Sequence, residues 1–116
     1  MSLLDKLLRI NAAYDAHYRG VDPFRIATRL AEECGELAAE VNHFEGVGSK
    51  RQKRGAPDRT ALAGEVIDVM RCALQVASYY DALPQVEAEA ERVVKLLEQR
   101  GWLPAEAGPG DENRTT

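Results

Sequence analysis

Two groups of acidic residues could do chemistry together, one at Glu32, Glu33 and Glu36 and the other at Glu65 and Asp68. Both lie in strongly helical patterns, in which residues three or four apart share one side of a helix. Carboxylates gathered at one place repel one another unless a positive charge lies between them. The two groups therefore indicate a site for divalent cations, and such sites serve chemistry on phosphorylated substrates.

The type of ligand indicates which cation the site suits. Oxygen-only sets favour hard cations, so we expect Mg²⁺, with Mn²⁺ as a further possibility, whereas zinc prefers histidine and cysteine. His17 and His43 are isolated in the sequence, and Cys34 and Cys72 have neither disulfide nor zinc spacing. We expect both thiols to be buried core residues.

Each acidic group also has a simpler explanation. The first can be a solvated helix face, although no Lys or Arg occurs between residues 31 and 49 to pair with it. The second lies on the narrow polar arc of an otherwise apolar helix, where Arg71 can pair with one acid and leave the other unmatched. A cation that bridges both helices accounts for the two groups together.

A basic stretch separates the two acidic groups, and its glycines and closing Pro57 are typical of an exposed loop. Its cations can hold the outer phosphates of a substrate as a flexible clamp, or can serve solubility alone. Arg59 and Arg71 are further candidates for phosphate contacts. The cations of the stretch are Lys50, Arg51, Lys53 and Arg54.

The first two helices that must position these residues begin at recognisable caps. Ser2 to Asp5 has the pattern of a capping box, and the helix it begins ends near Gly20. Asp22 and Pro23 begin a second helix that runs to about Phe44. The expected apolar face of this second helix consists of Ile26, Leu30, Cys34, Leu37, Val41 and Phe44.

Two further helices complete the predicted fold. Asp58 or Thr60 caps a third, which reaches about Tyr80 and is apolar over most of its circumference, so we expect it to be central and buried. A fourth follows the break at residues 81–84 and stops at Arg100 and Gly101. Its apolar stripe consists of Val86, Ala90, Val93 and Leu97.

The elements together predict an all-α, four-helix bundle-like protomer that is oligomeric, since so short a chain leaves much apolar surface uncovered. We expect one domain at residues 1–103 and a disordered tail at residues 104–116. The net charge of −4 argues against a nucleic-acid binder. Without a signal-peptide pattern or a membrane-length apolar run, a cytoplasmic location is expected.

The acidic pattern resembles that of the MazG-like all-α nucleoside triphosphate pyrophosphohydrolases. Their motif is Glu-x-x-Glu, a variable loop, and Glu-x-x-Asp. It matches Glu33-x-x-Glu36 followed by Glu65-x-x-Asp68, the second pair running into an apolar helix. The resemblance covers roughly residues 23–100. No convincing set of residues for recognising the base is matched.

The resemblance implies a magnesium-dependent hydrolysis between the α- and β-phosphates, which gives a nucleoside monophosphate and pyrophosphate. Such enzymes often remove non-canonical nucleotides. It also implies a homodimer or a homotetramer. The implied metal ligands are Glu33, Glu36, Glu65 and Asp68, with Glu32 as a further ligand or base. Glu36, or Glu33 beside it, is our candidate for the general base that takes a proton from the attacking water.

Two other functions are compatible with the sequence. Glu40-x-x-His43 matches one ligand fragment of di-iron carboxylate bundles, for which a dimer would supply the second copy. A non-enzymatic helical adaptor, with an acidic face for a basic partner, is the other alternative. The acids on the apolar third helix argue against the adaptor, because a partner surface does not require them there.

Overall fold

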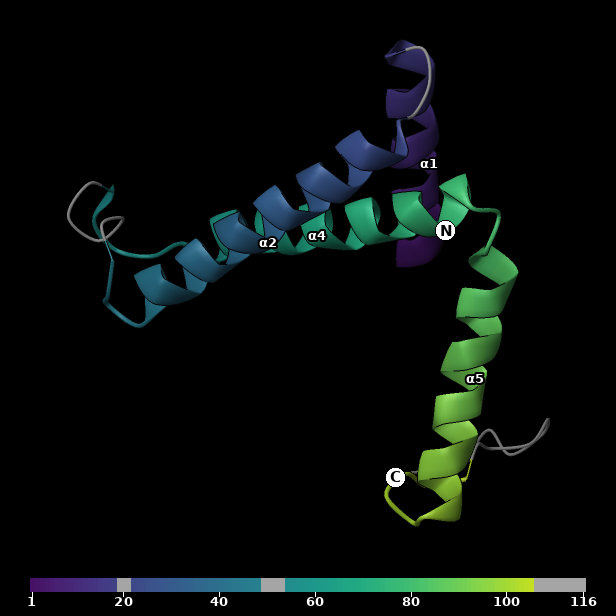
Figure 1. Ribbon diagram of the computed structural model, residues 1–116. Coiled ribbons are helices and arrows are strands. Elements are labelled where there is room, and N and C mark those ends of the chain that lie inside the picture. The colour runs from purple at the N-terminus through teal and green to yellow at the C-terminus, as the bar shows by residue number, and fades with distance from the viewer. Residues whose placement is uncertain (19–21, 49–53, 106–116) are drawn as a thin grey trace. The chain divides into compact units, whose positions relative to one another are not determined.

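The computed structural model describes residues 1–18, 22–48 and 54–105, and their regular structure is α-helical (Figure 1). This confirms the all-α prediction. None of the described helices combines the length and the apolar character needed to span a lipid bilayer. The helices are α1 (Leu3–His17), α2 (Pro23–Phe44), α4 (Arg59–Tyr79) and α5 (Leu83–Gln99).

Side-chain caps begin the first three of these helices, as the sequence predicts. Ser2 and Asp5 form the capping box of α1, in which the Asp5 amide donates to the Ser2 hydroxyl at 3.1 Å. The Asp22 carboxylate accepts from the amide of Phe24 at 2.9 Å at the start of α2. Of the two candidates for the cap of α4, Asp58 is the one that accepts, from the Thr60 amide at 2.9 Å.

The chain forms two compact units, residues 1–82 and residues 83–116. In the first unit α4 is the central helix, since it packs against both α2 and α1. Helix α5 belongs to the second unit, and none of its residues is fully buried. The bundle, the oligomer and the single domain at 1–103 stay predictions, and residues 106–116 of the expected tail lie outside the described residues.

The face by which α2 packs differs from the predicted apolar face. Cys34 and Val41 were expected in the core, but both are exposed. Glu33 and Glu40 are half-buried and buried instead. Apart from positions 39 and 43, the inward residues of α2 lie at 23, 26, 30, 33, 37, 40 and 44. These positions recur every 3.5 residues on average, which is the repeat of two helices packed along their length.

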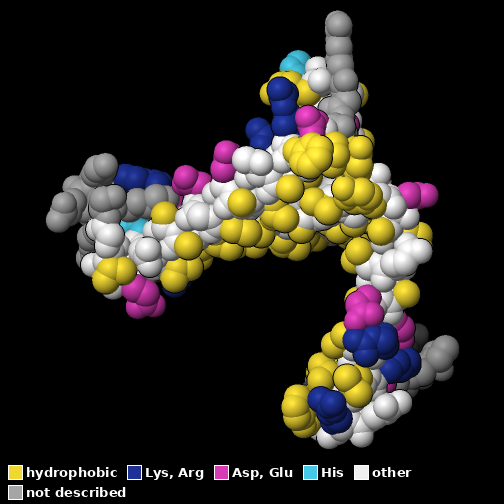
Figure 2. Space-filling model, in the orientation of Figure 1, with side chains coloured by type: hydrophobic (Ala, Val, Ile, Leu, Met, Phe, Trp, Pro, Cys, Tyr) yellow, Lys and Arg dark blue, Asp and Glu magenta, His cyan; other side chains and the backbone are white. Residues whose placement is uncertain are grey.

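The hydrophobic core of the described residues is small, because only Leu7, Ile26 and Cys72 are fully buried hydrophobic side chains. The third helix is central as predicted, but within the described chain it is not buried all round, since α4 leaves Val66 and Met70 each 38% exposed. Figure 2 shows hydrophobic side chains gathered over a continuous area of the part that contains α2 and α4. The described chain therefore leaves much apolar surface in contact with solvent.

Candidate metal centre

Three of the five predicted acids come together in the first unit. Glu33 of α2 and Glu65 and Asp68 of α4 each offer a carboxylate oxygen, and these oxygens lie within 4.8 Å of one another. Glu65 and Asp68 share a side of α4 because they are one turn apart. All three residues are half-buried, so the packing of α2 on α4 holds them together partly out of bulk water. We call these three residues the acidic triad.

The acidic triad suits a hard divalent cation. Its donors are all carboxylate oxygens, which Mg²⁺ and Mn²⁺ prefer and zinc does not. Negative groups at such separations repel one another more strongly where water is partly excluded, because the local dielectric is lower. A cation among them reverses that repulsion, so the donor set and its spacing fit the predicted magnesium site.

The other two predicted acids lie outside this group. Glu32 and Glu36 are both exposed on α2. Glu32 lies in the wall of the hollow that is described below. Glu36, one turn beyond Glu33, stays in contact with solvent, where a carboxylate can exchange protons with water. The sequence predicted that all five acids come together. The structure brings three of them together and leaves Glu32 and Glu36 outside.

Arg71 is a cation that contacts the triad, through Asp68. Its Nε donates to the Asp68 Oδ1 at 3.4 Å, and its guanidinium lies over the Tyr14 ring at 4.8 Å from the centroid. Its backbone carbonyl accepts from the Asn11 Nδ2 at 2.8 Å. Arg71 is 7% exposed, and its Nη1 is buried without a hydrogen-bond partner among the described residues. Arg71 therefore joins α1 to α4. It also pairs with one acid of the second acidic group, as the sequence predicted.

Cys72 lies beside Arg71 and is fully buried, which confirms the expectation of a core thiol for this cysteine. Burial raises the pKa of the Cys72 thiol, against the opposing effect of Arg71, and the negative charge of Glu33 raises it further. The neutral thiol is therefore favoured next to the acids. Cys34, the other expected core thiol, is exposed for the reason given above.

An open hollow of about 1000 Å³ lies between the end of α1 and the first half of α2, and Arg29 in its wall precedes Glu33 by about one helical turn. Its wall combines aromatic rings, arginines and acids, with Gln75 of α4 bonded to Asp15 of α1. Such a mixture suits a ligand with a planar ring and negative charge. The lining residues are Tyr14, Asp15, Tyr18, Asp22, Phe24, Arg25, Ile26, Thr28, Arg29, Glu32 and Gln75.

The sequence did not single out Asn11, Asp15 or Gln75. Their long-range hydrogen bonds, from α1 to α4, become visible only when the two helices are placed together. A polar residue at an inward position of an amphipathic helix was the one available signal. Asn11 gives that signal, since it follows the Leu7 position by one turn and is 4% exposed.

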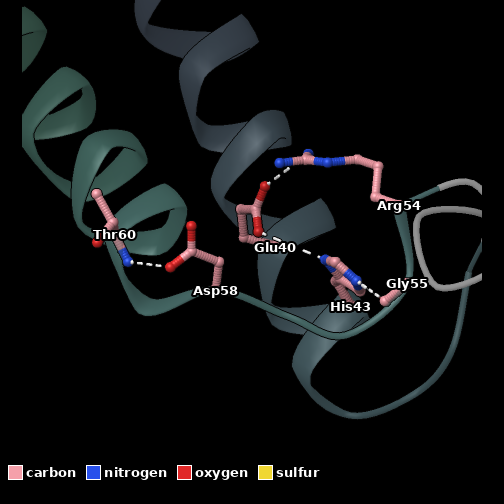
Figure 3. Close-up of polar contacts among 6 residues, drawn as sticks. All are labelled: Glu40, His43, Arg54, Gly55, Asp58 and Thr60. Atoms are coloured by element: carbon pink, nitrogen blue, oxygen red, sulfur yellow. Dashed lines mark hydrogen bonds and ion pairs between the residues drawn. The ribbon is translucent and has the colours of Figure 1, made fainter.

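The predicted phosphate clamp is only partly described. Lys50, Arg51 and Lys53 lie outside the described residues. Arg54 Nη1 lies 3.2 Å from the Glu40 Oε1, and its side chain is 49% exposed (Figure 3). Arg59 is exposed at the first position of α4. The role of these cations towards phosphate stays a prediction.

Glu40 and His43 are engaged with the segment that leads into α4 (Figure 3). They are 1% and 2% exposed. His43 Nε2 donates to the Gly55 carbonyl at 2.7 Å, because a carbonyl oxygen can only accept, and its Nδ1 lies 3.8 Å from the Glu40 Oε2. These two residues join the end of α2 to residues 54 and 55, and they lie outside the acidic triad.

No family model, curated protein or solved structure matches the chain. The geometry of the acidic triad and the composition of the hollow are therefore the basis for assigning a function.

Proposed function

We propose that this protein is a magnesium-dependent nucleotide pyrophosphohydrolase of the MazG-like type. The observation that carries the proposal is the acidic triad, in which Glu33, Glu65 and Asp68 bring carboxylate oxygens within 4.8 Å of one another from two packed helices. The matching pattern of acids in the sequence supports the same assignment, as does the hollow whose wall reaches to within one turn of Glu33.

The arrangement of the residues suggests how the reaction proceeds. Mg²⁺ bound by the triad would neutralise the phosphates and lower the pKa of an attacking water. Arg25 and Arg29, which line the hollow, provide positive charge for the phosphate chain. Glu36, exposed one turn from Glu33, is our candidate for the base that takes the proton of the water. The water adds to the α-phosphorus, and the bond to the bridging oxygen breaks to release pyrophosphate.

We further propose that the active form is a homodimer or a homotetramer. The described residues bury few hydrophobic side chains, and Phe24 and Val41 are 81% and 50% exposed. A second copy would remove such side chains from water, at about 25 cal/mol for each Å² of apolar surface. The nucleobase and the number of metal ions are left open by this proposal.

The proposal is tested by a panel of nucleoside triphosphates with Mg²⁺, scored for pyrophosphate and for phosphate. We expect pyrophosphate as the product. We also expect kcat/KM to fall at least about 100-fold in Glu33→Gln and in Asp68→Asn, since the triad is the one cluster of possible metal ligands found among the described residues. Glu45→Gln removes an exposed acid just after α2 and is the matched control. Near-normal turnover in both triad variants would remove the proposed site.

A separate measurement shows whether the cation binds at the triad. We expect Mg²⁺ to raise the melting temperature of the wild-type protein, because it binds the folded state, and to raise that of Asp68→Asn much less. Equal shifts in the two proteins would place the cation elsewhere.

The di-iron alternative is less well supported by the structure. Its Glu40 and His43 already contact Arg54 and Gly55, and a metal would have to displace those contacts. Anaerobic loading with Fe²⁺ followed by air separates the two functions. A diferric absorbance band without nucleotide turnover would favour the alternative.

A further inference from the structure

A half-buried pair of polar residues, Asp15 and Gln75, joins α1 to α4 in the wall of the hollow. The Gln75 Nε2 donates to the Asp15 Oδ1 at 2.7 Å, and both side chains are half-buried. Both residues also line the hollow, so the pair is presented to whatever occupies it. A pair fixed in this way can recognise a ligand by its pattern of donors and acceptors.

The donor and acceptor pattern of the pair follows from its chemistry. The Asp15 carboxylate can only accept, so the amide nitrogen of Gln75, and not its oxygen, faces it. The atoms left for a ligand are the second oxygen of Asp15, the Oε1 of Gln75 and one remaining N–H of the amide. Two acceptors beside one donor suit a ligand edge that carries an amino group next to a ring nitrogen.

Aromatic side chains provide flat surfaces beside this pair. Tyr14 and Tyr18 lie with their ring centroids 6.4 Å apart, and Phe24 is 81% exposed. All three rings line the hollow. Stacking on aromatic side chains holds bases of any identity, so the choice among bases falls to the polar pair.

The pair lies at a suitable distance from the acidic triad. Gln75 follows Asp68 by seven residues on α4, which is about 10 Å along the helix axis. Arg29, on the wall of the hollow, precedes Glu33 by about one turn of α2. A planar ring held at the pair can therefore direct a sugar and its phosphates along both helices towards the triad.

We propose that the Asp15–Gln75 pair reads the edge of the nucleobase and selects bases with an exocyclic amino group, cytosine or adenine, over the matching keto bases. The amino group donates to the oxygens of the pair, and the adjacent ring nitrogen accepts the remaining amide N–H. A keto oxygen at the same place would face the carboxylate without a hydrogen. This inference rests on the proposed function, because it assigns the ring to the nucleotide that the triad acts on.

The test compares substrates that differ only in this group, dCTP with dUTP and ATP with ITP, in the presence of Mg²⁺. For at least one pair we expect the wild-type kcat/KM to favour the amino substrate at least about tenfold. Asp15→Asn should reduce that ratio at least about fivefold, because an asparagine amide can donate to a keto oxygen. Asp81→Asn removes the same charge from an exposed turn and should leave the ratio unchanged. Melting curves check that the variants are folded.

A binding measurement separates failure of this inference from failure of the proposed function. Isothermal titration of CMP and UMP without Mg²⁺ should show tighter binding of CMP, and the same loss of preference in Asp15→Asn. No turnover of any triphosphate, with CMP still preferred, would overturn the proposed function alone. Three results would overturn the proposal that the Asp15–Gln75 pair selects the base. They are turnover without a preference for amino substrates, an unchanged ratio in Asp15→Asn, and the absence of both binding and turnover.

Discussion

Glu40 is almost completely buried near the end of α2, and its contacts show how the chain accommodates an acid there. Arg54 lies 3.2 Å from one oxygen of Glu40, and His43 lies 3.8 Å from the other. His43 in turn donates to the Gly55 carbonyl. A buried carboxylate needs a cationic partner such as Arg54, because desolvation without one is costly. The contacts therefore fasten residues 54 and 55 to the end of α2.

Removal of Arg54 should weaken this attachment. We expect Arg54→Ala to lower the free energy of unfolding by about 1–2 kcal/mol, less than for a fully buried pair, because Arg54 itself is about half exposed. Urea denaturation followed by circular dichroism measures the change. Arg59→Ala is the matched control, since it removes an exposed arginine from the first turn of α4. An equal effect of the two substitutions would contradict the role given to Arg54.

Cys72 makes a prediction about pH. Burial raises the pKa of its thiol, so the neutral thiol contributes stability that is present below the ordinary thiol pKa and is lost as pH rises through the raised value. In a Cys34→Ser variant, Cys72 is the only thiol. We expect its reaction with a thiol reagent at pH 8 to be much slower in the folded protein than in denaturant, since the thiolate is the reactive form. Equal rates would contradict the burial of this side chain.

The sequence predicted the acids individually better than it predicted their surroundings. Glu33 follows from helical spacing and from the absence of neighbouring cations, and Glu65 and Asp68 follow from their place on the polar arc of an apolar helix. Asp15 and Gln75 could not be predicted, because a contact between α1 and α4 depends on how those helices pack. The spacing of residues along one helix does not tell which residue of a neighbouring helix they contact.

At the scale of the helices, the ends were easier to predict than the faces. Caps depend on a few adjacent residues, so Ser2, Asp22 and Asp58 could be recognised directly. The prediction of the inward face of α2 was wrong at Cys34 and Val41, because a pattern of 100° per residue favours the most apolar arc of the helix. Packing along α4 instead follows a 3.5-residue repeat, which draws Glu33 and Glu40 inward.

The cap of α4 should contribute measurably to stability. We expect Asp58→Ala to lower the free energy of unfolding by about 1 kcal/mol, because the Thr60 amide loses its acceptor. Asp58→Asn keeps a side-chain oxygen and should retain most of the wild-type stability. Chemical denaturation of the three proteins measures both effects. A loss in Asp58→Asn as large as that in Asp58→Ala would attribute the effect to charge instead of to the cap.

At the scale of the whole molecule, the small core is the dominant feature. Leu7, Ile26 and Cys72 are the fully buried hydrophobic residues among those described, while Val66 and Met70 on α4 stay partly exposed. Large contiguous apolar surfaces of this kind mark places where another molecule binds. The all-α class needs only local patterns, whereas the surface that meets a partner depends on the arrangement of the helices.

If the protein assembles as proposed, the exposed side chains of α4 should be important for association. We expect Val66→Glu combined with Met70→Glu to shift the protein from dimer or tetramer to monomer, because charge at an apolar contact opposes association. Light scattering coupled to size exclusion measures the mass. Thr60→Glu places a charge in the exposed first turn of α4 and should leave the mass unchanged. A monomeric wild-type protein at micromolar concentration would contradict the proposal.

Arg71 connects two places that the proposals treat separately. Its guanidinium lies over the Tyr14 ring, in the wall of the hollow, and the same group bonds to Asp68 of the triad. A ring that stacks on Tyr14 competes for this guanidinium, and a cation beside Asp68 repels it. If the protein binds the proposed nucleotide and cation, their affinities would be coupled through this one side chain, and by thermodynamic reciprocity each would change the affinity of the other by the same factor.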